Sequence, residues 1–200
     1  MKKLLFSLIA IGFIFSAQAQ NNFGDKRKSS IAIRYNALDF GTADKVQIGS
    51  IGSVLNDRKW GQLASTTKSL GLSYSSQFTD QVDIYSSLDF AVTRSPLAFK
   101  STNTNVTTSS NENLLTSFES GINWKMLKGN YRVNPFVTVG LGVRTFAFRN
   151  YSAYAPVGLG LQIKTKNGSN LNVTTSYSTK MSKSFTPSYN YGLSYSFLLD

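Results

Sequence analysis

The sequence predicts an all-β fold: an eight-stranded antiparallel up-and-down transmembrane β-barrel. Three observations indicate it. The N-terminus has the form of a secretory signal, apolar and polar residues alternate through most of the remaining chain, and short and long connections between the alternating segments take turns. An exported chain built from period-two segments is typical of barrels that cross a bacterial outer membrane.

The first 19 residues have the parts of a signal peptide. Two lysines precede an apolar run from Leu4 to Phe15, and Ala17-Gln18-Ala19 matches a cleavage site. The run is shorter than the roughly 20 residues that a spanning helix needs. We therefore expect residues 1–19 to be cleaved, residues 20–29 to form a short periplasmic segment, and residues 30–200 to form the barrel.

The composition excludes most familiar catalytic designs. The sequence contains 0 Cys, which removes disulfides, thiolate sites and an acylated N-terminal cysteine. It also contains 0 His, which removes Ser-His catalysis and imidazole-bound zinc. We expect no enzymatic activity and no cofactor; a lipid-modifying barrel enzyme would have to work with carboxylates and serine.

The first four predicted strands differ in regularity. The first contains Ile31, Ile33 and Tyr35, but its phase slips near Asn36, so residues 38–40 require a bulge or an early end. The next three keep the alternation, with their apolar faces formed by Leu70, Leu72 and Tyr74, then by Val82, Ile84, Leu88 and Phe90, and then by Phe118, Ile122 and Trp124.

The last four predicted strands are regular. Their outward residues are Pro135, Val137, Val139, Leu141 and Val143, then Val157, Leu159, Leu161 and Ile163, then Leu171, Val173, Thr175 and Tyr177, and finally Tyr189, Tyr191, Leu193, Tyr195, Phe197 and Leu199. Closing such a sheet pairs every backbone amide and removes its edges, so residues 188–199 should neighbour residues 30–40.

The connections alternate in length. The short ones are Thr79–Gln81, Leu127–Tyr131 and Lys166–Ser169, and the longer ones are Phe40–Thr67, Arg94–Asn111, Arg149–Tyr154 and Met181–Pro187. Outer-membrane barrels have short periplasmic turns and longer external loops. We therefore expect an outer-membrane location, with the N-terminus periplasmic and the longer loops extracellular. A soluble secreted β-sandwich is the alternative.

Several stretches carry a family resemblance. They are VNPFVTVGLG from Val133, APVGLGLQI from Ala155, YGLSYSF from Tyr191 and, in the long first loop, LNDRKWGQL from Leu55. They resemble the N-terminal outer-membrane barrel of OmpA-like proteins of Bacteroidetes-type bacteria. Such proteins continue into a periplasmic peptidoglycan-binding domain, whereas the sequence stops at Asp200, so we expect the barrel without that domain.

Inward positions carry charges of both signs. A barrel of eight strands leaves an interior that side chains fill, and charges in so narrow a space must be paired. We expect Glu119 and Arg144, on adjacent strands, to form the central pair; the resemblance implies an internal ion-pair network of this kind. The members that we expect in the network are Glu119, Arg144, Arg34, Asp89 and Lys164.

Glycine recurs at inward positions of two neighbouring strands. The pairs Gly140/Gly142 and Gly158/Gly160 lie within alternating segments and do not complete a nucleotide-binding loop. We expect them to make room for aromatic side chains of the neighbouring strand, which are Phe136, Phe146 and Phe148.

The positive charge suggests lipid contacts. Removal of the two signal lysines leaves 19 basic against 10 acidic residues. The basic residues are scattered and form no nucleic-acid motif, so we expect no nucleic-acid partner. Those in the loops either contact lipopolysaccharide phosphates or are solvated; the candidates are Lys45, Arg58, Lys59, Lys100, Arg149 and Lys183.

These observations favour a structural outer-membrane barrel. We expect it to contribute to envelope integrity and to display surface loops, with its lumen plugged by paired polar and charged side chains. We expect a monomer that contacts outer-membrane lipid and lipopolysaccharide, and the outer-membrane insertion machinery during assembly. The alternative is a narrow gated channel or an adhesin acting through the loops Phe40–Thr67 and Arg94–Asn111.

Overall fold

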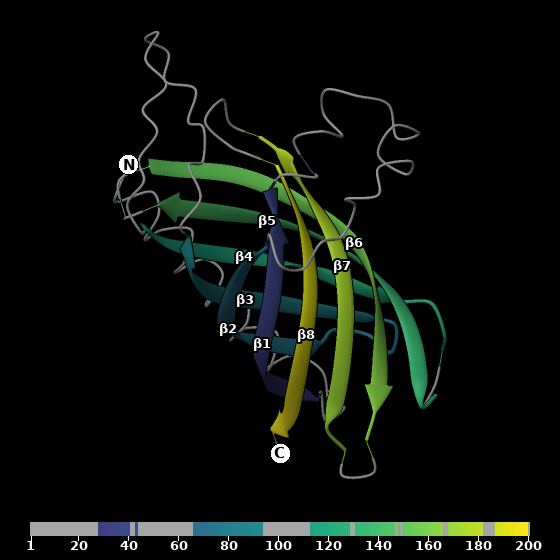
Figure 1. Ribbon diagram of the computed structural model, residues 1–200. Coiled ribbons are helices and arrows are strands. Elements are labelled where there is room, and N and C mark those ends of the chain that lie inside the picture. Colours follow the sequence, from purple (N-terminus) through teal and green to yellow (C-terminus); the bar gives the residue numbers. More distant parts are fainter. Residues whose placement is uncertain are drawn as a thin grey trace, which may run out of the picture.

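The computed structural model describes residues 28–40, 43, 66–93, 113–128, 131–146, 148, 150–165, 168–181 and 187–199. These residues form a closed antiparallel barrel in which each strand pairs with the next along the chain (Figure 1). The strands are β1 (Ser29–Asp39), β2 (Thr67–Gln77), β3 (Val82–Thr93), β4 (Asn113–Lys125), β5 (Val133–Phe146), β6 (Asn150–Lys164), β7 (Asn170–Lys180) and β8 (Ser188–Leu199). The predicted signal peptide lies outside the described residues.

The sheet closes between the two ends of the chain. β1 pairs antiparallel with β8 from Ser29 opposite Leu199 to Asp39 opposite Tyr189. The predicted eight-stranded barrel and its closing pair are therefore confirmed, and the alternative of a two-sheet sandwich is wrong. The connections at residues 78–81, 126–132 and 165–169 meet at one end, which we call the turn end; the opposite end is the loop end.

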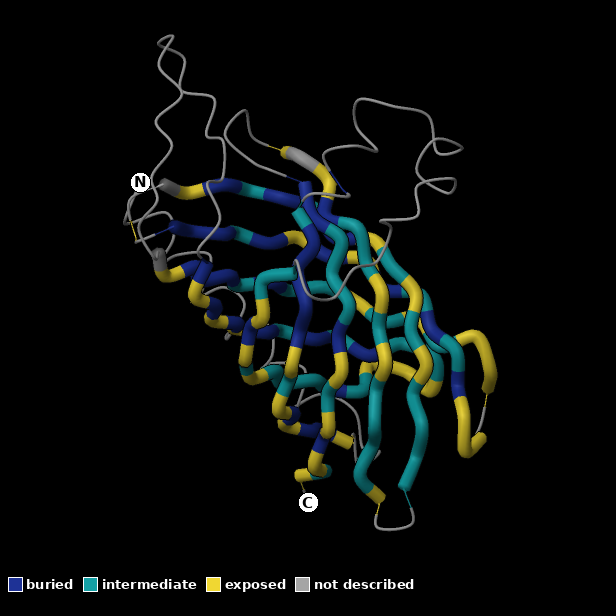
Figure 2. The backbone as a smooth tube through the Cα atoms, viewed as in Figure 1, coloured by how far each residue is buried: buried dark blue, intermediate teal, exposed yellow. Residues whose placement is uncertain are grey.

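The two faces of the sheet have opposite character. Buried and exposed residues alternate along the strands (Figure 2). The outward side chains are apolar and exposed, as shown by Leu70 at 62% and Leu141 at 60%. Most buried side chains are polar or charged, among them Ser69, Ser87, Asp89, Glu119, Thr138 and Arg144. An apolar outside around a polar inside is the pattern expected of a barrel surrounded by lipid.

β1 keeps its phase to its last residue. Its pairing with β2 runs without interruption from Ser29 opposite Ser76 to Leu38 opposite Thr67, so the bulge or early end expected at residues 38–40 is absent. Leu38 does not turn to the outside; it stays on the inner face and is buried. The apparent slip in the sequence is an apolar residue at an inward position.

The connection between β5 and β6 is shorter than predicted. β6 begins at Asn150, and Phe146 pairs with Asn150, so the segment Arg149–Tyr154 is mostly strand and not a loop. Phe148 in the connection has φ 55°, a left-handed conformation that closes a tight turn. The polar and aromatic residues at the start of β6 obscure its alternation in the sequence.

One interruption occurs in the β5–β6 pairing. The register passes from Val139 opposite Val157 to Gly142 opposite Tyr154, and the skipped positions face Pro156 and its neighbour. Proline has no N–H to donate to the ladder, which accounts for the gap.

Within the described residues, no helix is long and apolar enough to cross a membrane.

Candidate functional site in the barrel lumen

Large inward side chains lean over glycines on the neighbouring strand. The ring of Phe136 on β5 occupies the space that a Cβ of Gly160 on β6 would need, and the ring of Tyr154 on β6 lies in the same way over Gly142 on β5. Tyr85 on β3 extends over Gly121, so that its hydroxyl reaches β5. The predicted steric role is seen at Gly160 and, with a tyrosine in place of a phenylalanine, at Gly142, whereas the atoms nearest Gly158 belong to Thr175 and Ser176.

Two of the three predicted aromatic partners behave differently. Phe136 packs over a glycine as expected. Phe146 is buried in an apolar cluster at the loop end, and Phe148 lies in the β5–β6 turn with 59% of its surface exposed. The prediction for Phe148 was wrong because the strand ends before it, so the period-two rule no longer sets its direction.

Arg34 and Asp89 meet above a glycine. Both face Gly71 of β2, Arg34 from β1 and Asp89 from β3. With no side chain between them, Arg34 Nε lies 3.7 Å from Asp89 Oδ1. Asn36 Nδ2 donates a hydrogen bond of 2.8 Å to the same oxygen. The structure therefore joins two residues of the predicted network into one ion pair.

Glu119 is held by two tyrosines. The hydroxyl of Tyr85 donates to Oε1 at 2.7 Å and the hydroxyl of Tyr154 donates to Oε2 at 3.3 Å. Thr138 Oγ1 in turn donates to the Tyr85 hydroxyl at 3.3 Å. The carboxylate on β4 thus accepts hydrogen bonds from β3 on one side and from β6, two strands away, on the other.

Arg144 lies in the layer nearer the loop end. Its guanidinium carbon is 4.8 Å from the ring centroid of Tyr154 and 5.4 Å from that of Phe40, and Nη1 donates to Ser188 Oγ at 3.1 Å. Across the β4–β5 ladder Arg144 faces Ser117, whereas Glu119 faces Gly142, so the two predicted partners are diagonal neighbours. Tyr154 contacts both and connects them.

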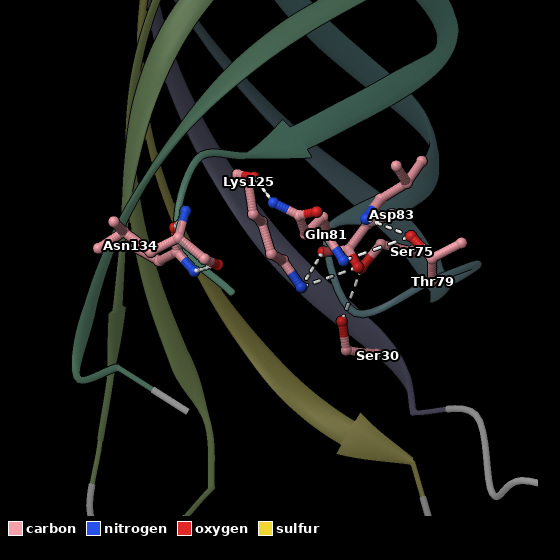
Figure 3. A network of polar contacts seen from close by, with 9 residues as sticks. Ser30, Ser75, Thr79, Gln81, Asp83, Lys125 and Asn134 are labelled. Carbon is pink, nitrogen blue, oxygen red and sulfur yellow. Dashed lines mark hydrogen bonds and ion pairs between the residues drawn. The ribbon is translucent and has the colours of Figure 1, made fainter. Parts of the chain in front are cut away.

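A second polar group lies at the turn end (Figure 3). Lys125 Nζ is within 2.9 Å of both carboxylate oxygens of Asp83, and Gln81 Nε2 donates to the Lys125 carbonyl at 3.4 Å. Ser30 and Ser75 share a hydrogen bond of 2.8 Å. Asn134 closes the β4–β5 turn by bonding both backbone groups of Leu127.

Lys164 belongs to this second group and not to the central network. It is the last residue of β6 at the turn end. Its electrostatic neighbours are Lys125, Lys28 and Asp83. The alternation in the sequence predicts that Lys164 faces inward, but alternation does not give the position of a residue along the barrel axis.

The two tyrosines that organise the network, Tyr85 and Tyr154, are not among the predicted site residues. Tyr154 lies in the segment that the sequence predicts to be a loop, and no predicted role falls on Tyr85. A signal for them in the sequence is an inward tyrosine opposite an inward glycine, because the register pairs Gly142 with Tyr154.

The six predicted lipopolysaccharide contacts lie outside the described residues; they are Lys45, Arg58, Lys59, Lys100, Arg149 and Lys183.

A polar cavity of about 80 Å³ occupies the lumen between the central network and the turn end. Charged side chains line it on the β1, β3 and β4 side, and amides and hydroxyls line it on the β7 and β8 side. Among the described residues, the amide oxygens of Asn36, Asn172 and Asn190 are buried there without a hydrogen-bond partner. No three potential metal-ligating side chains gather within the described part of the chain.

The sequence matches no protein-family model and no curated protein. Among solved structures, Neisserial surface protein A is similar with a TM-score of 0.53 and 11% identity, covering 86% of this chain and 96% of that one. The chain has the fold of an outer-membrane β-barrel. The N-terminal barrel domain of Pseudomonas aeruginosa OprF has a TM-score of 0.49 and 13% identity over 87% of this chain and all of that one.

The outer membrane enzyme PagL is another structural neighbour. It has a TM-score of 0.45 and 13% identity, covering 84% of this chain and 98% of that one. At these identities the likeness concerns the fold, which supports many functions.

Proposed function

We propose that the chain is a structural protein of the bacterial outer membrane that contributes to envelope integrity, displays its loop-end connections and keeps its lumen closed. The outward apolar face and the closed ladder support a place in a lipid bilayer. The chain opens with a signal-like segment, which supports export.

The observation that carries this proposal is the filled lumen. Asp89, Glu119 and Arg144 are buried and the Arg34 side chain is only 13% exposed; each of the four contacts a charged, amide, hydroxyl or aromatic group of another strand. A wide diffusion pore needs an open lumen, whereas these side chains occupy much of it.

We propose that the turn end faces the periplasm and the loop end faces the cell exterior. The two longest connections, residues 40–66 and 94–112, leave the barrel at the loop end, which supports this orientation. In that orientation the basic loop residues Lys45, Arg58 and Lys59 would stand beside lipopolysaccharide phosphates.

We infer that the barrel has no catalytic role. The sequence lacks His and Cys, and the described lumen carboxylates are engaged: Asp83 with Lys125, Asp89 with Arg34, and Glu119 with two tyrosines. A lipid-hydrolysis assay on the purified protein tests this inference, and turnover abolished by Glu119→Gln would overturn it.

Heat modifiability tests the main proposal. We expect the mature protein in the outer-membrane fraction to migrate fast on a detergent gel without boiling and slowly after boiling. Planar bilayers containing the folded protein should show no unitary conductance. A single unshifted band in the soluble periplasmic fraction would contradict the outer-membrane barrel, and steady conductance would contradict the closed lumen.

A further inference from the structure

The loop end of the lumen contains an apolar cluster. Leu38, Ala91, Leu115 and Phe146 are all buried and pack together, although they come from β1, β3, β4 and β5. Ala91 faces Leu115 across one ladder, and Leu115 faces Phe146 across the next. Leu38 reaches them from beyond β2. We call these four residues the loop-end seal.

Phe40 and Arg144 cover the inner edge of the seal. Phe40 packs against the seal and also approaches the guanidinium of Arg144. The Tyr154 ring lies against the same guanidinium. The guanidinium beside the seal is thus flanked by two aromatic rings.

The lumen between the seal and the turn end is polar. The cavity reaches the last inward residues at the turn end, including Ser30, Lys125 and Ser196. The buried acceptors of Asn36, Asn172 and Asn190 line it. Buried polar atoms require partners, and a polar space of this size accommodates ordered water.

Water and ions therefore meet two different obstacles along the axis. The side chains of the charged network carry hydrogen-bond donors and acceptors, so water and ions can exchange contacts with them. The four side chains of the seal offer neither a donor nor an acceptor on the β1, β3, β4 and β5 side of the lumen, and apolar constrictions stop ions by excluding water. The seal is thus the layer where a hydrated ion finds no replacement for its water.

We propose that the lumen is a blind, water-filled cavity entered from the turn end, and that the loop-end seal, not the charged network, is its barrier to ions. This inference rests on the proposed closed lumen and adds which layer closes it.

Substitutions in the two layers separate these roles. In planar bilayers, Leu115→Ser/Phe146→Ser should produce unitary openings that the wild type lacks. Glu119→Gln, the matched change in the network, should stay as silent as the wild type. Each variant is first shown to be folded by its fast-migrating form on an unboiled gel.

The outcomes distinguish this inference from the function on which it rests. Conduction by Glu119→Gln, or silence of the folded double variant, would refute the apolar seal and leave the closed wild-type lumen intact. Conduction by the wild type would refute the closed lumen itself.

Thiol labelling provides a test that leaves the lumen closed. The sequence has 0 Cys, so single cysteines introduced at Thr174, in the cavity, and at Leu115, in the seal, can be compared directly. The folded protein in detergent is treated with a small water-soluble thiol reagent. Thr174→Cys should react at least about tenfold faster than Leu115→Cys, because the apolar seal excludes water and the reagent dissolved in it. Equal rates would overturn the proposal.

Discussion

At Gly142 the missing side chain allows Tyr154 to cross from β6 towards β4. A Cβ there would collide with ring and hydroxyl atoms of Tyr154, and that tyrosine contacts both Glu119 and Arg144. A glycine on β5 therefore makes room for a tyrosine of β6 that contacts Glu119 on β4 and Arg144 on β5.

Gly142→Ala should destabilise the barrel by about 1 to 3 kcal/mol, because one added methyl overpacks the lumen at the Tyr154 ring. Denaturant unfolding in lipid vesicles measures the change. Adding Tyr154→Leu removes the collision, so the double variant should lose less than the sum of the single losses. Strict additivity would show that the ring does not contact this glycine.

Tyr154→Phe should cost about 1.5 to 3 kcal/mol, the range for a hydrogen bond to a charged group, because Glu119 loses one donor while the ring beneath Arg144 remains. Tyr154→Leu should cost more, since it removes the ring as well. The same unfolding titration compares the two variants. Equal losses would mean that the ring contributes nothing beyond its hydroxyl.

At the scale of an element, the β5–β6 hairpin depends on its turn. Phe148 adopts φ 55°, a conformation that favours glycine and is rare for a bulky residue. Its side chain is exposed, so little packing opposes replacement. The hairpin that it closes holds both Phe146 and Tyr154 in their places.

Phe148→Gly should therefore stabilise the barrel by about 0.4 to 1 kcal/mol, because relief of the left-handed backbone exceeds the added freedom of the unfolded chain. Tyr151→Gly, in the adjoining strand, is the matched control and should destabilise it. For both variants the measurement is the temperature at which half of the protein changes from the fast-migrating to the slow-migrating form on the gel. A loss with Phe148→Gly would indicate that its ring makes a stabilising contact.

At the scale of the whole molecule, the direction of each face decides stability in lipid. Leu141 is exposed on the outer face, whereas Gln162 lines the cavity. The same ladder that pairs these strands gives the two residues opposite surroundings.

Leu141→Arg should destabilise the folded barrel in vesicles by about 2 to 4 kcal/mol, the range for a charge near the bilayer midplane. Gln162→Ala should be mild, because it shortens a side chain beside a cavity. Folding yields into vesicles of fixed composition compare the variants. Equal yields would mean that the two faces are assigned to the wrong sides.

The sequence by itself determined the period-two segments, their outward faces and the closure of the last strand on the first. These follow from local alternation, because successive side chains in a strand point to opposite faces. It also placed Arg34, Asp89, Glu119 and Arg144 inside. Only the tertiary structure decided which of them meet, because a partner depends on the register of neighbouring strands and on where glycines leave room.

The same limit explains the misread first strand. Leu38 looked like an error of phase because one strand shows one apolar exception. When the barrel closes, that exception meets Ala91, Leu115 and Phe146 from three other strands and becomes a packed layer. Contact across a lumen joins residues far apart in the chain, and no local pattern contains that information.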